Sequence, residues 1–323
     1  MSPNTSTMLK NKLKAHASKL GFLDLKIAKA KELIAEFANM QKWLDDGMHA
    51  DMQWLERNKE KRRNIGLVLE NAKSVIVLSH SYYTGIDYPQ FEIKEVNAGK
   101  ISRYAWGDDY HDVLMPKIKE IESLIIQEFP DSKNLCYIDT GPILEKQWAV
   151  RAGIGWQGKN SLVLSPDYGS YFFLCVIIST AEFEPDTAIA DKCGTCVKCI
   201  KACPTDAIVA DGVVDSRKCL SYWTIEAKHH IEIPTEISEK MEGWIFGCDI
   251  CQEVCPWNKN KPKITDFVSF QPRNGSTVLQ HDSIAQMSDI EFTERFSKSP
   301  IKRLKLLGLK RNSKALQTSL KTK

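Results

Sequence analysis

The stretch Cys193-Gly-Thr-Cys196-Val-Lys-Cys199-Ile-Lys-Ala-Cys203-Pro204 is the most informative part of this 323-residue chain. Its spacing, C-x2-C-x2-C-x3-C-P, is the bacterial pattern for cysteines that bind [4Fe–4S] clusters. Three thiolates in a tight loop bind one cubane, and the fourth leaves on a helix toward a second cluster. The stretch therefore predicts a compact segment with two clusters and further cysteine ligands elsewhere in the chain.

A second run, Cys248-x2-Cys251-x3-Cys255-Pro256, lacks one of the usual four cysteines, and Cys219 is the obvious substitute. We expect a first cysteine set of Cys193, Cys196, Cys199 and Cys255, and a second cysteine set of Cys203, Cys219, Cys248 and Cys251. Structural zinc sites are the alternative, because zinc also favours Cys-x2-Cys pairs. A zinc ribbon, however, has no use for a third cysteine at this spacing or a fourth before proline. Two adjacent clusters form a short path for single electrons.

The remaining cysteines, Cys136 and Cys175, lie in predicted strands, and we expect both to be buried as small hydrophobic side chains. The longest strongly apolar run, Tyr171 to Ile178, is far too short to cross a bilayer, and Met1 to Lys12 has no signal-peptide core. We expect a cytoplasmic monomer without membrane contact. In that compartment paired cysteines usually indicate metal or redox chemistry rather than disulfides.

Charge is distributed unevenly along the chain, whose net charge is +3. Residues 297–323 carry nine Lys or Arg residues and no Asp or Glu, which leaves a net charge of −6 on the rest. Such a basic terminus is either a solvated segment or an arm that binds phosphates. The candidate phosphate contacts are Lys302, Arg303, Lys310 and Arg311.

Apolar periodicity predicts a mixture of helices and strands. Helices are expected within 7–63, over 108–129 and 143–152, and in pieces around 290–296 and 300–320. Strands are expected at 73–80, 135–139, 161–165 and 171–180, and residues 262 to about 283 read as loop. The absence of a regular βαβ rhythm indicates an α+β sheet domain. We divide the chain into a sheet domain (1–190), a ferredoxin-like two-cluster domain (191–260) and a helical, basic segment (261–323).

The stretch Gly153-Ile-Gly-Trp-Gln-Gly158 matches the dinucleotide pattern G-x-G-x-x-G letter for letter. That fingerprint must follow a strand and open a helix, whereas here it follows a predicted helix and leads into a strand. We therefore reject a dinucleotide site. A helix C-cap followed by a turn explains one glycine, and the loop that continues into Lys159 and Asn160 can approach a large ligand closely.

Several stretches together resemble the epoxyqueuosine reductase family, cobalamin-dependent enzymes of the last step of queuosine synthesis in tRNA. The resemblance rests on Tyr137–Lys146 (YIDTGPILEK), on Ala152–Asn160 (AGIGWQGKN) and on the cysteine runs. It extends to Gly47–Leu55, Arg62, Arg103–His111 and Ser299–Arg303, and so covers most of the chain. Family members often continue into a C-terminal helical-repeat domain, of which 261–323 would be a truncated version.

This resemblance implies a function and a cofactor. The family reduces the epoxide of epoxyqueuosine at the wobble position of tRNA, using cobalamin that is reduced through two [4Fe–4S] clusters. The sheet domain would be the family's cobalamin-binding fold, similar to flavin-dependent reductases. Asp139 falls where the family keeps its proton-donating aspartate. The expected cobalamin contacts are Arg62, Ser102, Asp139, Trp156, Gly158, Lys159, Asn160 and Ser221. The expected partners are the tRNA and an external low-potential electron donor.

Alternatives remain for the residue and for the protein. Asp139 or Thr140 could simply cap the helix expected near Pro142. A reductive dehalogenase would share the clusters and the corrinoid, but usually carries a twin-arginine export signal, which is absent here. A ferredoxin-type electron-transfer protein would share only the clusters.

Overall fold

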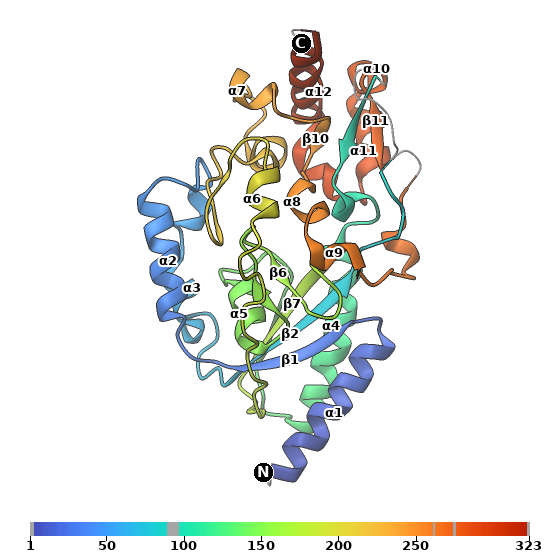
Figure 1. The fold of residues 1–323 in the computed structure, drawn as a ribbon. Helices are drawn as coiled ribbons and strands as arrows, with labels where there is room; N and C mark the ends of the chain where they lie inside the picture. Colours follow the sequence, from blue (N-terminus) through green and yellow to red (C-terminus); the bar gives the residue numbers. More distant parts are fainter. Residues whose placement is uncertain (1–2, 89–96, 261, 274–275, 322–323) are drawn as a thin grey trace.

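The structure, a computed structural model, describes residues 3–88, 97–260, 262–273 and 276–321. Its central layer is a four-stranded antiparallel sheet (Figure 1). The strand order is β1 (Asp24–Lys29), β2 (Ser74–Ser81), β7 (Phe172–Ser179) and β4 (Asn134–Tyr137). The central strands β2 and β7 are buried almost throughout, as their continuous apolar sequences require.

Helices cover both faces of this sheet. The helices α1 (Pro3–Lys19) and α4 (Tyr110–Glu128) lie against one face, and α5 (Glu145–Ala152) lies against the other (Figure 1). Adjacent β2 residues serve the two sides, because side chains alternate along a strand: Ile76 belongs to the core under α4 and Val77 to the core under α5. Helix α4 turns one apolar row inward, formed by Leu114, Ile118, Ile121 and Ile125.

A second, three-stranded sheet lies at the other end of the molecule. Strand β3 (Ala98–Ile101) pairs in parallel with β10 (Trp244–Phe246) and antiparallel with β11 (Val278–Gln280). These strands come from all three of the segments predicted from the sequence, so packing crosses the boundaries at 190 and 260. The division into three domains remains a description of the sequence.

Helix α7 and the helices of the C-terminal segment share one hydrophobic core with this second sheet. They are α7 (Thr235–Ser238), α10 (His281–Gln286), α11 (Asp289–Phe296), the 3-10 helix η6 (Pro300–Leu304) and α12 (Lys305–Lys321). Trp244, Phe246, Ile301 and Leu309 are fully buried there. Ser288 and Glu291 form a capping box that starts α11.

The cysteine-rich segment consists of short elements between the two sheets (Figure 1). It contains α6 (Lys198–Ala202), the hairpin β8 (Ile208–Ala210) and β9 (Val213–Val214), the π-helix η4 (Tyr222–Glu226), α8 (Ile250–Glu253) and α9 (Pro256–Asn260). Helices α6 and α8 pack against each other. A second hairpin, β5 (Trp156–Gln157) and β6 (Val163–Leu164), joins this segment to α5.

The remaining elements are α2 (Ile34–Asp45), α3 (Lys59–Arg63) and the 3-10 turns Gln53–Leu55, Ile65–Leu67, Arg103–Ala105 and Val268–Phe270. Two sequence predictions were wrong. Residues 24–29, expected to be helical, form edge strand β1, in which Leu25 and Ile27 are buried. Residues 281–286, expected largely as loop, form α10. Among the described residues, no helix has the length and apolarity needed to span a membrane.

The glycine pattern at 153–158 has the reversed context predicted from the sequence. Gly153 ends α5 in the left-handed region, with φ of 85°. A Cβ there would lie 2.2 Å from the carbonyl oxygen of Thr187, so glycine is required both by conformation and by space. The chain then enters the β5–β6 hairpin rather than a helix. Rejection of the dinucleotide site is therefore supported.

Candidate active site

The structure brings the members of the first cysteine set together. Burial raises the pKa of Cys199, and the nearby Cys255 and Cys193 thiolates raise it further. Burial likewise raises the pKa of Cys255, and nearby Cys193 and Cys196 add to that shift. Cys255, just before α9, therefore lies within electrostatic reach of the other three thiols, which lie before and in the first turn of α6.

The members of the second cysteine set also lie together. Burial raises the pKa of Cys248, and the nearby Cys251 and Cys219 thiolates add to the shift. Burial raises the pKa of Cys251 as well, with contributions from Cys219 and from Cys203 among others. No residue of the first set is needed to explain these shifts. Members of each set therefore lie within electrostatic reach of one another, although they come from distant parts of the chain. Within the part of the chain that the structure describes, no three His, Cys, Asp or Glu side chains already stand in an arrangement that could hold a metal ion.

The loop Trp156–Asn160 runs from one cysteine group to the other. The indole N–H of buried Trp156 donates to Sγ of Cys193 over 3.4 Å, and the ring packs edge-on against Trp257. At the other end, Nδ2 of buried Asn160 donates to the carbonyl oxygen of Cys251 over 3.5 Å. Trp156 and Asn160 therefore contact the cysteine segments, although the sequence suggested cobalamin contacts for both.

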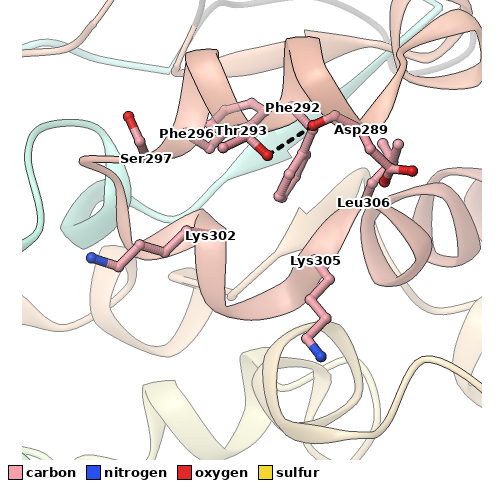
Figure 2. Close-up of a pocket in the computed structure, with 8 residues that line it drawn as sticks. All are labelled: Asp289, Phe292, Thr293, Phe296, Ser297, Lys302, Lys305 and Leu306. Carbon is pink, nitrogen blue, oxygen red and sulfur yellow. Dashed lines mark hydrogen bonds between the residues drawn. The ribbon is translucent and has the colours of Figure 1, made fainter.

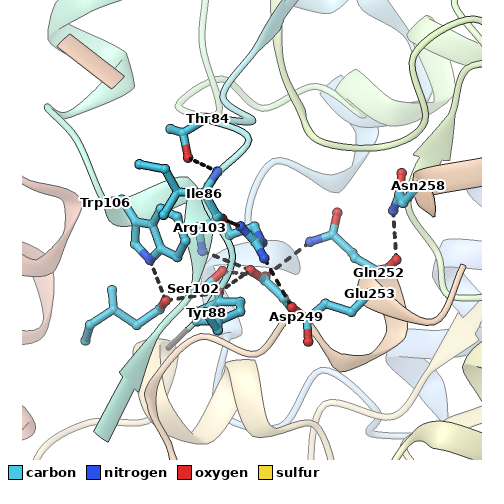
Figure 3. A network of polar contacts seen from close by, with 11 residues as sticks. Thr84, Ile86, Tyr88, Ser102, Arg103, Trp106, Asp249, Gln252, Glu253 and Asn258 are labelled. Atoms are coloured by element: carbon cyan, nitrogen blue, oxygen red, sulfur yellow. Dashed lines mark hydrogen bonds and ion pairs between the residues drawn. The ribbon is translucent and has the colours of Figure 1, made fainter. Parts of the chain in front are cut away.

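A buried carboxylate fastens the second set to the rest of the protein (Figure 3). Asp249, only 1% exposed, lies between Cys248 and Cys251 in the sequence. Its Oδ1 accepts from the Ser102 hydroxyl at 2.6 Å, and its Oδ2 accepts from the Tyr88 hydroxyl at 2.7 Å and from the Arg103 N–H at 2.9 Å. Charge-assisted hydrogen bonds of this kind hold a loop firmly.

This network corrects the expectation for Ser102. Its side chain is 3% exposed and its hydroxyl donates to Asp249, so it is not free to contact a cofactor. The neighbouring Arg103 is buried among the rings of Tyr88 and Trp106 and donates to Glu253 (Figure 3). Residues 102–103 therefore anchor the 248–253 segment, and we do not carry Ser102 into the cofactor site.

Asp139 lies in the loop between β4 and α5. Its φ is 55°, in the left-handed region, and its side chain is exposed to solvent. The Tyr110 hydroxyl donates to Oδ2 of Asp139 at 3.0 Å, and the Asp139 N–H donates to Oε1 of Glu145 at 2.7 Å. Helix α5 begins after Leu144 and has no side-chain cap. The alternative reading, in which Asp139 or Thr140 caps this helix, is therefore wrong.

Glu145 and Lys146 open α5 beside Asp139. Lys146 is exposed to solvent, yet desolvation by surrounding protein lowers its pKa, and the charges of Asp139, Cys219 and Glu145 oppose that shift. Burial, followed by the nearby charge of Asp139, raises the pKa of Glu145 to about 8. The charges of Asp139, Cys219 and Glu145 all act on Lys146, so these four side chains are neighbours. We call this neighbourhood, formed by Asp139, Glu145, Lys146 and Cys219, the Asp139 recess.

Tyr110 is a neutral donor in this arrangement. Burial and the nearby charge of Asp139 raise its pKa far above the usual range for tyrosine. Its ring stacks on Phe173, which fixes the direction of the hydroxyl. Sequence reasoning assigned no role to Tyr110, Glu145 or Lys146, although all three lie in stretches that carry the family resemblance. The structure brings these three side chains together around Asp139, which no spacing in the sequence indicates.

The other predicted cofactor contacts have different surroundings from one another. Arg62 is buried and donates to the carbonyl oxygen of Arg57 at 2.7 Å, which makes it part of the α3 structure. The Lys159 ammonium pairs with Asp211 at 3.0 Å. Gly158 is buried, and a Cβ there would meet Leu164 at 2.6 Å. Ser221 hydrogen-bonds Cys219, a boundary of the Asp139 recess.

The basic residues of the C-terminal segment differ in how far their side chains are exposed and in which groups they pair with. Lys302 is exposed and pairs with Asp109 at 2.9 Å, and Arg303 pairs with Glu226 at 2.7 Å. Burial raises the pKa of Glu226, and the negative charge of Asp139 raises it further, whereas the positive charge of Arg303 lowers it. Glu226 thus lies within electrostatic reach of both Arg303 and Asp139. Lys310 is partly exposed.

Arg311 does not fit the expectation of a phosphate contact. Its guanidinium donates to the carbonyl oxygens of Trp223, Ala227, Lys228 and Ile231 at 2.6–3.1 Å, and Nε donates to the Asn312 side chain. Every N–H of the side chain is used within the protein. Arg311 therefore holds the segment after η4 against α12, and we remove it from the candidate tRNA contacts.

A hollow of about 410 Å³ lies on the C-terminal segment, between α11, η6 and the start of α12 (Figure 2). Phe292, Phe296 and Leu306 form its apolar part, and Lys302 and Lys305 stand at its edge. Only Lys302 among the predicted site residues contributes to it. The hollow is thus separate from the cysteine sets and from the Asp139 recess.

Two parts of the chain match known protein families. Residues 192–258 match the family described as "4Fe-4S double cluster binding domain", which contains both cysteine sets. The chain is thus an iron–sulfur protein of the double-cluster class. Residues 62–140, which include Tyr110 and Asp139, match the family described as "Epoxyqueuosine reductase QueG, DUF1730".

Relatives over nearly the whole length define the family. The chain is 43% identical to an epoxyqueuosine reductase of Synechocystis sp. over 85% of this chain and 93% of the relative. It is 41% identical to that of Cellulophaga algicola over 96% of this chain and 98% of the relative. The chain belongs to the epoxyqueuosine reductase family.

Solved structures agree with this assignment. A structure of epoxyqueuosine reductase with an epoxyqueuosine-modified tRNA-Tyr stem loop superimposes with a TM-score of 0.90 at 30% identity, covering 98% of this chain and 82% of that one. A Bacillus subtilis epoxyqueuosine reductase, described as having its catalytic aspartate loop swung out of the active site, gives a TM-score of 0.90 at 29% identity with the same coverage. The predicted α+β fold is confirmed.

Proposed function

We propose that this protein reduces the epoxide of epoxyqueuosine to the cyclopentene of queuosine at the wobble position of tRNA. The observation that carries the proposal is that Lys146 interacts electrostatically both with Asp139, whose carboxyl group accepts from Tyr110, and with Cys219 of the second cysteine set. Reduction of the epoxide to an alkene and water consumes two electrons and two protons, and Asp139 would deliver one of these protons. Membership of the family supports this reading over a dehalogenase or a simple electron carrier.

Two [4Fe–4S] clusters fit the two cysteine sets. We assign Cys193, Cys196, Cys199 and Cys255 to one cluster and Cys203, Cys219, Cys248 and Cys251 to the other. Each set offers four sulfur donors, as a cubane requires, and burial of several of the thiols suits ligands that are deprotonated only when metal is bound. When bound, the clusters carry single electrons from an external low-potential donor toward the recess.

We infer that a corrinoid binds at the Asp139 recess. The Asp139 and Lys146 side chains are both exposed to solvent there, so a ligand can reach them. We infer that Asp139, Ser221 and the loop Gly158–Asn160 border the cofactor, whereas Arg62, Ser102 and Trp156 are engaged elsewhere. A corrinoid would supply the strong reductant for carbon that protein side chains cannot supply.

Asp139 would supply the proton. The oxygen leaving an opened epoxide develops negative charge, and a carboxylic acid within hydrogen-bond reach stabilises it by donating a proton. Because Tyr110 donates to Oδ2, the other oxygen of Asp139 is left to carry that proton toward the substrate. A neutral Glu145 keeps a second negative charge away from the developing alkoxide.

The substrate is a tRNA, and we propose Lys302, Arg303 and Lys310 as phosphate contacts. Arg303 pairs with Glu226, whose pKa is also raised by the charge of Asp139. The related structure with a modified stem loop supports a tRNA anticodon arm as the ligand. We further propose that the protein acts as a cytoplasmic monomer.

Anaerobically reconstituted protein, supplied with cobalamin, a low-potential reductant and epoxyqueuosine-containing tRNA, tests this proposal. Nucleosides from the digested tRNA are analysed by mass spectrometry. We expect loss of one oxygen from the modified nucleoside, dependent on both cobalamin and reductant. Fully clustered protein that leaves epoxyqueuosine intact would contradict the proposal.

A further inference from the structure

The loop that carries Asp139 is held by few contacts. Ile138 and Ile143, on either side of its tip, are buried in two different hydrophobic cores. Between them, Asp139 adopts a left-handed backbone conformation, which is unfavourable for residues other than glycine and is tolerated best by Asn and Asp. The conformation therefore needs stabilising contacts from outside the loop.

Glu145 supplies one of these contacts in an unusual way. As the first residue of α5, it would ordinarily leave its side chain free, and the preceding Leu144 provides no cap. Instead its Oε1 reaches back six residues and accepts the Asp139 N–H at 2.7 Å. Tyr110 holds the carboxyl end of the same residue at 3.0 Å. Main chain and side chain of Asp139 are thus fixed by different elements, α5 and α4.

We propose that Glu145 is a positioning residue that holds the Asp139 loop in its reactive orientation. The inference rests on the proposed role of Asp139 as proton donor. Glu145 acts on the reaction through Asp139, by accepting the backbone N–H of that residue. The length of the Glu145 side chain matters because its acceptor oxygen must lie within hydrogen-bond distance of the Asp139 nitrogen, 2.7 Å here. The negative charge of Glu145 is not required, since an amide oxygen accepts equally well.

The charged and titratable groups around Glu145 are consistent with this neutral role. Asp139 and Lys146 lie on its own connection and helix, Tyr110 faces it from α4, and Cys175 faces it from β7. Burial and the Asp139 charge favour the protonated form of Glu145 near neutral pH. A protonated carboxyl group keeps a carbonyl oxygen that accepts the N–H.

Three substitutions separate reach from charge. Glu145→Gln keeps the length and an acceptor oxygen, Glu145→Asp keeps the carboxyl group but is one methylene shorter, and Glu145→Ala removes both. Amide hydrogen exchange of the 138–144 segment in the iron-loaded protein is the first measurement. We expect exchange at Asp139 to accelerate roughly 10-fold in the Ala and Asp variants and to stay near wild type in the Gln variant. Glu294→Ala, an exposed acidic position on α11, is the matched control.

Turnover of epoxyqueuosine tRNA is the second measurement. The Ala and Asp variants should lose roughly 10-fold in kcat with little change in KM for tRNA or in iron content, and the Gln variant should retain activity. Unchanged exchange in both short variants, or a Gln variant as impaired as the Ala variant, would overturn the proposal. If Glu145→Ala does not fold, the comparison of Asp with Gln still decides.

Failure of the proposed function gives a different result. If Asp139 is not the proton donor, Asp139→Asn turns over normally, while the Ala and Asp variants of Glu145 still loosen the 138–144 segment. If Glu145 is not a positioning residue, Asp139→Asn loses turnover while exchange in the Glu145 variants stays at the wild-type rate.

Discussion

The hydroxyl of Tyr110 lies 3.0 Å from Oδ2 of Asp139 and donates a hydrogen bond to it. The two residues come from α4 and from the loop before α5, and the charge of Asp139 and that of Cys219, in the second cysteine set, both act on Lys146. Tyr110 stays neutral because burial and the Asp139 charge raise its pKa. In the proposed mechanism, the other carboxyl oxygen of Asp139 delivers the proton to the substrate.

Tyr110→Phe tests that contact. The substitution keeps the ring that stacks on Phe173 and removes only the donor. We expect kcat to fall roughly 3- to 10-fold, because one neutral hydrogen bond contributes about 0.5–1.5 kcal/mol. Iron content and tRNA affinity should not change. Wild-type turnover in this variant would show that Asp139 is oriented without Tyr110.

Iron content tests the assignment of the cysteine sets. Anaerobically reconstituted protein should hold about eight irons per chain, since eight thiolates suit two cubanes. Cys199→Ser and Cys251→Ser should each lose about four, one from each set. Cys175→Ser, in the sheet core, is the control and should keep its iron. Stoichiometric zinc without visible absorption would contradict the cluster assignment.

Arg311 and Lys302 should behave differently although both are basic residues of the C-terminal segment. Arg311→Ala leaves four backbone carbonyls without their donor, so we expect it to lower the free energy of unfolding by about 2–4 kcal/mol. Lys302→Ala removes one partly exposed ion pair, with Asp109, and should lower the free energy of unfolding by no more than about 1 kcal/mol. Urea unfolding measures both, and equal effects would contradict the structural role of Arg311.

Salt dependence tests the phosphate contacts. If Lys302 and Lys310 each meet a phosphate, each alanine variant should lower the slope of log K against log salt by roughly 0.7–0.9. Lys12→Ala on α1, at the opposite end of the molecule, should leave the slope unchanged (Figure 1). An unaltered slope in both variants would make the basic segment a solvated surface.

The raised pKa of Glu145 predicts a dependence of stability on pH. Its pKa is about 8 in the folded protein, against an ordinary value near 4.5, so the folded state binds more protons between these pH values. The stabilising contribution is therefore complete below about pH 4.5 and is lost as pH rises through about 8. Between pH 6 and 8.5, Tm should fall less steeply in Glu145→Gln than in the wild type. Parallel Tm curves for the two proteins would contradict the shift.

Features that depend on local spacing could be predicted from the sequence. The cysteine runs indicated two clusters, because ligand spacing in a loop is a local property. Helix α4 and strands β2 and β7 followed from apolar patterns. Asp139 was found through the family resemblance, which the relatives confirm as membership of the family.

Features that depend on contacts between residues far apart in the sequence could not be predicted from it. Ser102 and Asp249 are 147 positions apart, so no spacing could show that the serine hydroxyl is already used. Arg311 looked like a free cation, because the carbonyls that occupy it lie 80–88 positions away. Strand β1 was read as helix because its apolar residues also suit a helical period, and only pairing with β2 decides.

Turnover of epoxyqueuosine tRNA by Asp139→Asn tests the central claim most directly. Asparagine tolerates the left-handed conformation of Asp139 and can still accept from Tyr110, so the loop geometry should persist. Its amide cannot deliver the acidic proton. We expect about eight irons and bound corrinoid to be retained, with single-turnover reduction slowed roughly 10²–10⁴-fold. Reduction at the wild-type rate would contradict the account, because the proton would then come from another group.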